Sequence, residues 1–233
     1  MSPRCVVHRL GQVGYRQAWS WQQALLKERF RGDAPAPADV CLMLQHPPVY
    51  TLGRGASLDH VKFDPMAETA FELIKVDRGG EVTHHAPGQL VVYPIMNLTR
   101  APFKKDLHWY LRQVEQVVIE TLGAFDIAGE RVDGLTGVWV SDGRHAFPKS
   151  KIAAVGTHAS KWITMHGFAL NVSTDLAGFD RIVPCGLHDK AVSRIQDFRP
   201  DVQMVDVEDA VIAAVQNVFQ VDVETTTAPP YES

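Results

Sequence analysis

One stretch of the sequence decides the fold: GVWVSDGRHAFPKSKIAAVGTHASKWITMHGFALNV, residues 137–172. It contains three apolar runs, at 137–140, 151–156 and 162–172, and a polar segment with Gly, Pro and charged residues separates the first two. Short runs rich in Val, Ile and aromatic residues are typical of β-strands, and a polar segment between two of them is typical of a hairpin loop. We therefore expect three successive strands in the middle of the chain.

Further strands are expected on the N-terminal side of this stretch. VCLMLQ at 40–45 is an apolar run that ends before two prolines, and FELIKV at 71–76 alternates between apolar and polar residues. QLVVYPIMNL at 89–98 is a third apolar run. It contains Pro94, which has no N–H to donate, and this argues for a strand at the edge of the sheet or for a bulge.

Helices are expected outside this group of strands. Apolar residues recur at helical spacing over residues 14–30. A second helix is expected between Asp106, as its N-cap, and Gly123, which ends it, and a third is expected to follow Asp206. Because helices and strands do not alternate along the chain, the predicted class is α+β, with a mixed, largely antiparallel sheet flanked by helices.

The chain shows no internal repeat or linker, so we expect one domain. Its expected span is 1–223. Residues 224–233 show no periodicity and are expected to form a disordered tail.

Composition and charge exclude several classes of protein. The 233 residues are 45% hydrophobic, enough for a full core. The net charge is −4 and the pI about 6.2, whereas nucleic-acid-binding domains usually have a pI above about 9. No apolar run approaches the roughly 18 residues of a membrane span, and the N-terminus has no signal-peptide core. We therefore expect a cytoplasmic protein that binds neither nucleic acid nor membrane.

The three cysteines differ in their surroundings. Cys41 lies inside an apolar run and Cys5 near the N-terminus, and both are interpreted as small buried hydrophobic residues. Cys185 stands in RIVPCGL, where the flanking proline and glycine favour an exposed thiol. No C-x-x-C pair or zinc spacing is present, so we expect no metal.

A cysteine nucleophile needs help to ionise. A thiol with a pKa near 8.5 is only a few per cent thiolate at neutral pH, so a cation or a base must lie close to it. Lys151 opens the apolar run KIAAVG and is a candidate partner for Cys185. A lysine at such a position, taken alone, is more often a surface residue whose stem lies along apolar neighbours.

The segment RGGEVTHHAPGQL, residues 78–90, combines an arginine, adjacent glycines and paired histidines. Its glycines allow the backbone to approach a ligand, and its polar side chains offer donors. It matches neither a P-loop nor a dinucleotide-binding glycine motif. A hairpin with polar side chains that have no function is an equally good interpretation of its composition. His84 and His85 would point to opposite faces of a strand, so at most one of them should face a site.

Five blocks in this order resemble one family, the octanoyltransferases of lipoic acid biosynthesis. The similarity covers nearly the whole chain. The blocks are QHPPVYTLGRGA (45–56), RGGEVTHHAPGQLVVYPI (78–95), GVWV (137–140) followed by KIAAVG (151–156), MHGFALNV (165–172) and FDRIVPCGL (179–187).

The resemblance implies a fold shared with biotin and lipoate protein ligases and a catalytic dyad of Cys185 and Lys151. It also implies an acyl-substrate site in three of the blocks. The residues carried over to that site are Arg78, Gly79, Gly80, Glu81, Val82, Thr83, His84, His85, Ala154, Val155, Gly156, Gly167, Phe168 and Ala169.

The chain departs from the family pattern at three positions. His84 stands where the family usually has an aromatic residue, Ala86 where it has glycine, and His158 where arginine is common. Ala86 argues against a strict need for a positive φ at that position. His84 bears on the shape of the acyl pocket.

The function that the resemblance implies is transfer of an octanoyl or lipoyl group from acyl carrier protein, through a thioester on Cys185, to a lysine of a lipoyl-domain protein. The implied acceptors are the lipoyl domains of 2-oxoacid dehydrogenase complexes and the glycine cleavage H protein. We expect a monomer without a cofactor.

Two alternatives remain open from the sequence. One is an ATP-dependent lipoate or octanoate ligase of the same fold, which would not need the thiol of Cys185. The other is a catalytically silent protein that holds acyl groups or carrier proteins.

Overall fold

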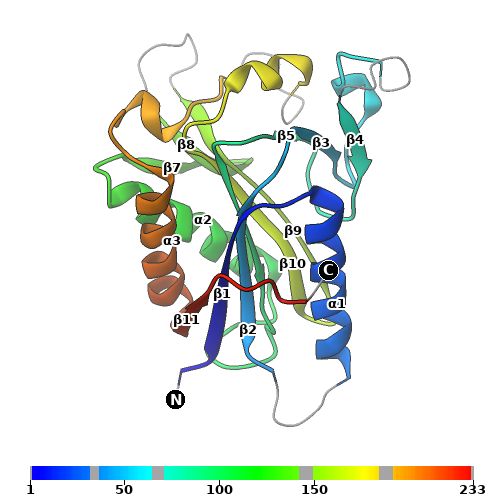
Figure 1. The fold of residues 1–233 in the computed structure, drawn as a ribbon, viewed down its shortest axis with the longest axis vertical. Helices are drawn as coiled ribbons and strands as arrows, with labels where there is room; N and C mark the ends of the chain where they lie inside the picture. The colour runs from blue at the N-terminus through cyan, green and yellow to red at the C-terminus, as the bar shows by residue number, and fades with distance from the viewer. Residues whose placement is uncertain (1, 32–36, 65–70, 142–148, 184–190, 232–233) are drawn as a thin grey trace.

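The computed structural model describes residues 2–31, 37–64, 71–141, 149–183 and 191–231. Its centre is an eight-stranded sheet, seen nearly edge-on in Figure 1. Along the sheet the order is β11 (Asp222–Thr226), β1 (Arg4–Gln12), β2 (Asp39–Gln45), β6 (Gln89–Ile95), β10 (Ile163–Asn171), β9 (Ser150–Ser160), β8 (Leu135–Val140) and β7 (Gly129–Val132).

The direction of the strands agrees with the predicted class. β1 runs parallel to both β2 and β11, and every other neighbouring pair in this sheet is antiparallel. The three strands expected within 137–172 are β8, β9 and β10, and they are consecutive neighbours in the sheet. The prediction of an α+β fold with a mixed, largely antiparallel sheet is confirmed.

A second, smaller sheet contains three strands. β3 (Val49–Leu52) lies in its middle, parallel to β4 (Glu72–Lys75) and antiparallel to β5 (Val82–His85). In Figure 1 it lies at the upper end of the large sheet, on the side of α1. Of these strands β4 was expected, and β5 was expected only in the interpretation of 78–90 as a hairpin. β3 was not expected; it has four residues and lies between Pro48 and Gly53.

Helices cover both faces of the large sheet. α1 (Tyr15–Phe30) packs on one face, and α2 (Leu107–Gly123) and α3 (Met204–Phe219) pack on the other (Figure 1). Alternate residues of β2 supply both cores: Leu42 and Leu44 pack toward α1, and Cys41 and Met43 toward α2 and α3. Because both faces of β2 are buried, residues 40–44 are all apolar.

The helix boundaries follow capping chemistry. The carboxylate of Asp106 accepts hydrogen bonds from the backbone N–H groups of His108 and Trp109, as expected of an N-cap. The prediction for the last helix was wrong by three residues. Gln203 is the N-cap, and Asp206 is the third helical residue, whose carboxylate accepts from the Gln203 N–H.

β1 is the main element that the sequence did not reveal. Because β1 and β2 are parallel and α1 connects them, the chain begins with a β-α-β crossover. The expectation that helices and strands would not alternate is therefore wrong for the first 45 residues. It holds for the antiparallel strands that follow.

Pro94 lies inside the sheet and not at its edge, because β6 has β2 on one side and β10 on the other. Pro94 is paired with Cys41 on β2. The pairing of β6 with β10 ends at Val92 and Phe168, before Pro94 is reached, and Pro94 O accepts a hydrogen bond from the Thr164 hydroxyl at 2.7 Å. The missing N–H is thus tolerated where the regular ladder stops.

The C-terminal segment is more ordered than expected. Glu224, Thr225 and Thr226 belong to β11 and pair with β1, so they are part of the sheet. Further on, the Tyr231 hydroxyl donates to the Glu28 carboxylate at 2.9 Å. None of the helices in the described residues combines the length and apolar character that crossing a bilayer requires.

Candidate active site

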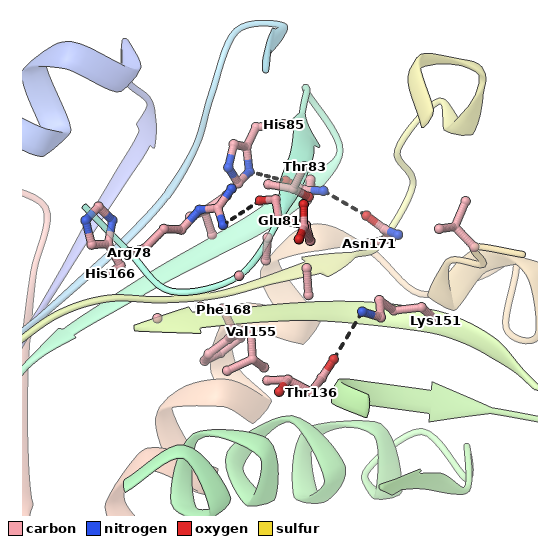
Figure 2. A pocket seen from close by; sticks show the side chains of 18 of the residues that line it. Arg78, Glu81, Thr83, His85, Thr136, Lys151, Val155, His166, Phe168 and Asn171 are labelled. Carbon is pink, nitrogen blue, oxygen red and sulfur yellow. Dashed lines mark hydrogen bonds between the residues drawn. The ribbon is translucent and has the colours of Figure 1, made fainter. Parts of the chain in front are cut away.

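A cavity of about 250 Å³ lies against β9 and β10, beneath β5 and the loop that contains Arg78 (Figure 2). The two cross-strand pairs Ala154–Ala169 and Gly156–Gly167 carry little or no side chain. A sheet face with such small residues leaves room above it that larger side chains would fill. The cavity is therefore a consequence of four small residues on adjacent strands.

The glycines also allow the covering loop to approach. A Cβ on Gly156 would lie 2.9 Å from Gly79 O, and the Gly79 N–H donates to Thr157 O at 2.9 Å. A Cβ on Gly53 would lie only 2.0 Å from Gly80 O, so a side chain there would push the same loop away. The loop is thus pinned to β9 through its backbone.

The Arg78 side chain holds its own loop in place through hydrogen bonds to backbone carbonyls. Its guanidinium donates to the carbonyls of Gly79, Glu81 and Thr51 at 2.9 to 3.0 Å, and to the Thr51 hydroxyl at 2.8 Å. The side chain lines the cavity, but these four bonds direct its N–H groups into the protein. Its position indicates that Arg78 shapes the cavity.

We expect Arg78→Lys to lower the free energy of unfolding by about 3 kcal/mol, because an ammonium cannot satisfy four acceptors that a planar guanidinium satisfies together. Urea unfolding of the variant measures this loss. Arg54→Lys, which replaces an exposed arginine nearby, is the control and should change stability by less than about 0.5 kcal/mol. A loss for Arg78→Lys no larger than for the control would contradict this structural role.

His85 and His84 point to opposite sides of β5, as predicted. His85 lines the cavity, whereas His84 packs against Tyr50 and Phe179, with ring centroids 4.6 and 5.5 Å away. His84 thus occupies an aromatic cluster, and burial lowers its pKa to about 4. A neutral histidine ring there explains how the chain tolerates a departure from the aromatic residue of the family pattern.

The hydrogen bonds of His85 fix its protonation. Asn171 Nδ2 donates to the carbonyl of Ser193, so Asn171 Oδ1 is an acceptor, and Gln89 Nε2 donates to it at 2.9 Å. Gln89 Oε1 must then accept from His85 Nδ1, at 2.7 Å. The Thr51 hydroxyl, which accepts from Arg78, lies 3.5 Å from His85 Nε2.

His85 is therefore neutral with its proton on Nδ1. Burial lowers its pKa well below the usual value, and the neighbouring His46 lowers it further. Because burial disfavours the charged ring and Nδ1 is already bonded to Gln89, His85 is poorly placed to exchange protons with a substrate.

Lys151 lies at one end of the cavity. Its Nζ donates to Thr136 O at 3.1 Å (Figure 2). The Nζ also stands 4.8 Å from the centre of the Trp139 ring. Its backbone pairs with the segment 191–193: the Lys151 N–H donates to Ala191 O at 2.9 Å, and the Ser193 N–H donates to Lys151 O at 3.0 Å. Cys185 lies outside the described residues. After Cys185 the described chain resumes at Ala191, whose carbonyl is bonded to the Lys151 N–H.

A buried histidine and a carboxylate lie at the other end. His166 Nε2 is 2.8 Å from Asp77 Oδ1, and this hydrogen bond lowers the pKa of Asp77 to about 2. His158 Nε2 is 3.7 Å from the second oxygen of Asp77. His158, the third departure from the family pattern, thus presents its ring to an acidic neighbour. Among the described residues no group of three or more His, Cys, Asp or Glu side chains is arranged to hold a metal ion.

Most of the residues expected at the acyl site meet at this cavity. Three do not line it: Gly79, Val82 and His84. The lining residues among those expected are Arg78, Gly80, Glu81, Thr83, His85, Ala154, Val155, Gly156, Gly167, Phe168 and Ala169, together with Lys151.

About half of the residues that line the cavity were not expected from the sequence. Gln89, Asn171 and His166 lie within the quoted blocks, and their polar character inside apolar strands was an available signal. Val91, Tyr93 and Phe179 also lie within the quoted blocks, but as apolar or aromatic residues they gave no such signal. The remaining missed residues lie outside the blocks, where the sequence gives no hint of proximity. The missed lining residues are Tyr15, Gln89, Val91, Tyr93, Gly134, Leu135, Thr136, His166, Asn171, Phe179 and Val192.

Comparison with known proteins identifies close relatives. Residues 14–216 match the family model of the lipoyl protein ligase A/B catalytic domain. An octanoyltransferase of Thermosynechococcus vestitus is 51% identical over 210 residues, covering 90% of this chain and 88% of the relative. An octanoyltransferase of Gloeobacter violaceus is 49% identical over 222 residues, covering 95% of this chain and 93% of the relative.

Solved structures show the same fold at low sequence identity. A bipartite lipoate protein ligase from Thermoplasma acidophilum, studied with its E2 lipoyl domain, superposes with a TM-score of 0.74 at 18% identity, covering 99% of this chain and 88% of that one. A lipoate-protein ligase A bound with ATP superposes with a TM-score of 0.73 at 17% identity, covering 99% and 90%.

Proposed function

The chain belongs to the lipoyl protein ligase A/B catalytic family and is an acyltransferase, and from this premise we propose that it carries the acyl group on Cys185 and passes it to a protein lysine without ATP. The donor is an octanoyl thioester of acyl carrier protein. The acceptors are lipoyl domains of 2-oxoacid dehydrogenase complexes and the glycine cleavage H protein, in the cytoplasm. The catalytic domain is expected over residues 1–223, and β11, whose Glu224, Thr225 and Thr226 pair with β1, continues past that boundary.

One observation carries this proposal. Lys151 lies at the end of a cavity with a floor of small residues, and its backbone is bonded to the segment that follows Cys185. An apolar floor of Ala and Gly suits an unbranched fatty acyl chain. A lysine ammonium at the carboxyl end of that chain is where a thiolate would need a neighbouring cation.

The first step is an exchange of thioesters. The Cys185 thiolate attacks the carbonyl carbon of the donor, a tetrahedral intermediate forms, and the carrier thiolate leaves and takes up the proton of the Lys151 ammonium. One C–S bond forms and one breaks, so the step is nearly balanced in energy. The Lys151 ammonium would stabilise the thiolate before attack.

The second step makes the amide. The acceptor lysine attacks the Cys185 thioester, the C–S bond breaks, and the surplus proton of the amine must leave. Lys151, having given up its own proton, can accept it. His85 and Arg78 suit this role less well, because His85 Nδ1 is bonded to Gln89 in a buried place that disfavours the charged ring, and an arginine stays protonated.

An assay with two donors tests the proposal against an ATP-dependent ligase. Octanoyl-carrier protein without ATP should modify a lipoyl domain, and free octanoate with ATP and Mg²⁺ should not. The mass of the acceptor, increased by one octanoyl group, is the measurement. Modification only from free octanoate with ATP would assign the chain to the ligase activity, and no modification from either donor would favour a silent binding protein.

A further inference from the structure

A buried carboxylate on α2 lies behind the wall that holds Lys151. Glu115 is 1% exposed, and its two oxygens have different partners. Oε2 accepts from Arg112 at 2.7 Å and from Arg131 at 3.1 Å, and Oε1 accepts from the Gly137 N–H at 3.1 Å. A carboxylate is costly to bury, and here three donors share the compensation: two guanidinium groups and one backbone N–H.

The Gly137 N–H belongs to the same peptide group as the carbonyl of Thr136. That carbonyl accepts the Lys151 Nζ at 3.1 Å. A single rigid peptide plane therefore has a carboxylate on its N–H side and an ammonium on its C=O side. Because hydrogen bonds in a chain polarise one another, the carboxylate strengthens the carbonyl as an acceptor for Lys151.

The glycine at this junction has a geometric reason. Gly137 has a φ of +117°, a conformation that other residues rarely adopt. A Cβ there would lie 2.7 Å from Ala153 O and 3.3 Å from Lys151 Cε. The lysine stem thus lies where a side chain at residue 137 would need to be, so the Thr136–Gly137 peptide both contacts the stem and binds the ammonium.

We propose that Glu115 is a positioning residue for Lys151, acting through the Thr136–Gly137 peptide. This inference rests on the proposed role of Lys151 in acyl transfer. Glu115 itself lines no part of the cavity and touches no substrate. Its function is to hold the acceptor carbonyl in one orientation, so that Nζ stays at the place where the thioester is made and broken.

The test compares two variants of Glu115. Glu115→Gln has one acceptor oxygen in place of two, so it cannot serve both the arginines and the Gly137 N–H. Glu115→Asp keeps the charge, and the flexible arginines can follow it, but the shorter side chain withdraws from the backbone N–H. We expect kcat for octanoyl transfer to fall by about 10- to 100-fold in either variant, because small displacements of a reacting group cost that much. The KM for octanoyl-carrier protein should stay within about twofold.

Two controls separate positioning from general loss of stability. Arg112→Gln removes one ion pair but leaves the bond from Oε1 to Gly137, and it should keep the wild-type kcat. Asp39→Asn alters another buried carboxylate that pairs with an arginine and accepts a backbone N–H, that of Asn97, away from the cavity. It should lower the melting temperature without lowering kcat.

The outcomes distinguish this inference from the proposed function. All rates are measured below the melting temperature and normalised to the folded fraction from circular dichroism. If wild type transfers octanoyl and Lys151→Ala does not, but folded Glu115→Gln and Glu115→Asp match wild type in kcat, the positioning role is wrong and the proposed function stands. If Glu115→Gln does not fold, Glu115→Asp alone decides. If wild type itself transfers nothing without ATP, the proposed function fails first.

Discussion

Cys185→Ser is expected to abolish octanoyl transfer, with a loss of at least about 10³-fold, because removal of a covalent nucleophile eliminates the reaction path and leaves only binding effects. A serine hydroxyl in the same place is far less ionised than a thiol and makes an ester that the acceptor amine attacks more slowly. The measurement is the initial rate of lipoyl-domain octanoylation from octanoyl-carrier protein. The folded fraction should match wild type.

Cys41 provides the matched control. It is fully buried in β2, and burial raises its pKa to about 12, so it is inert as a nucleophile. Cys41→Ala should lower stability by about 1 kcal/mol through the lost packing, and leave the transfer rate per folded enzyme unchanged. Equal rates in Cys185→Ser and wild type would remove the covalent mechanism.

Lys151→Ala is also expected to lower the rate of octanoyl transfer strongly. We expect transfer to fall by about 10²- to 10⁴-fold, the usual contribution of a positioned acid or base, while the protein still folds. The lysine supports two events, ionisation of the thiol and removal of the proton from the acceptor amine. Single-turnover measurements should therefore show both slow formation of the acyl-enzyme and slow release of the acyl group.

Lys149 is a control of the same residue type two positions away. Its Nζ forms an ion pair with Glu130 at 2.8 Å, and it does not line the cavity. Lys149→Ala should transfer octanoyl at the wild-type rate. If both variants kept full activity, Lys151 would have no catalytic role, and if Lys149→Ala alone lost activity, the lysine would have been assigned to the wrong position.

The fold was predictable where local signals agreed. The strands within 137–172 have β-forming residues in short runs, and α2 has both a capping Asp106 and a terminating glycine, so pattern and chemistry point to the same elements. β1 was missed because its polar residues, such as Arg4 and Arg9, form ion pairs with acidic residues late in the chain, which local sequence cannot reveal. The same holds for β11, which is ordered by its parallel pairing with β1.

The site was predictable only in part for a related reason. Residues in contiguous blocks, such as Ala154 and Gly156, could be carried over from the family pattern. Tyr15 and Thr136 lie outside those blocks, and only the tertiary fold brings them to the lining of the cavity. Arg78 lies where expected, but only the structure reveals that its guanidinium is bonded to backbone carbonyls.

A thioester on Cys185 that forms without ATP can be detected by intact-protein mass spectrometry. Wild type and Cys185→Ala are incubated with octanoyl-carrier protein in the absence of ATP and acceptor. We predict one octanoyl adduct on wild type, removed by hydroxylamine, and none on Cys185→Ala. An equal adduct on both proteins, or no adduct on wild type while it still octanoylates a lipoyl domain, would contradict the account.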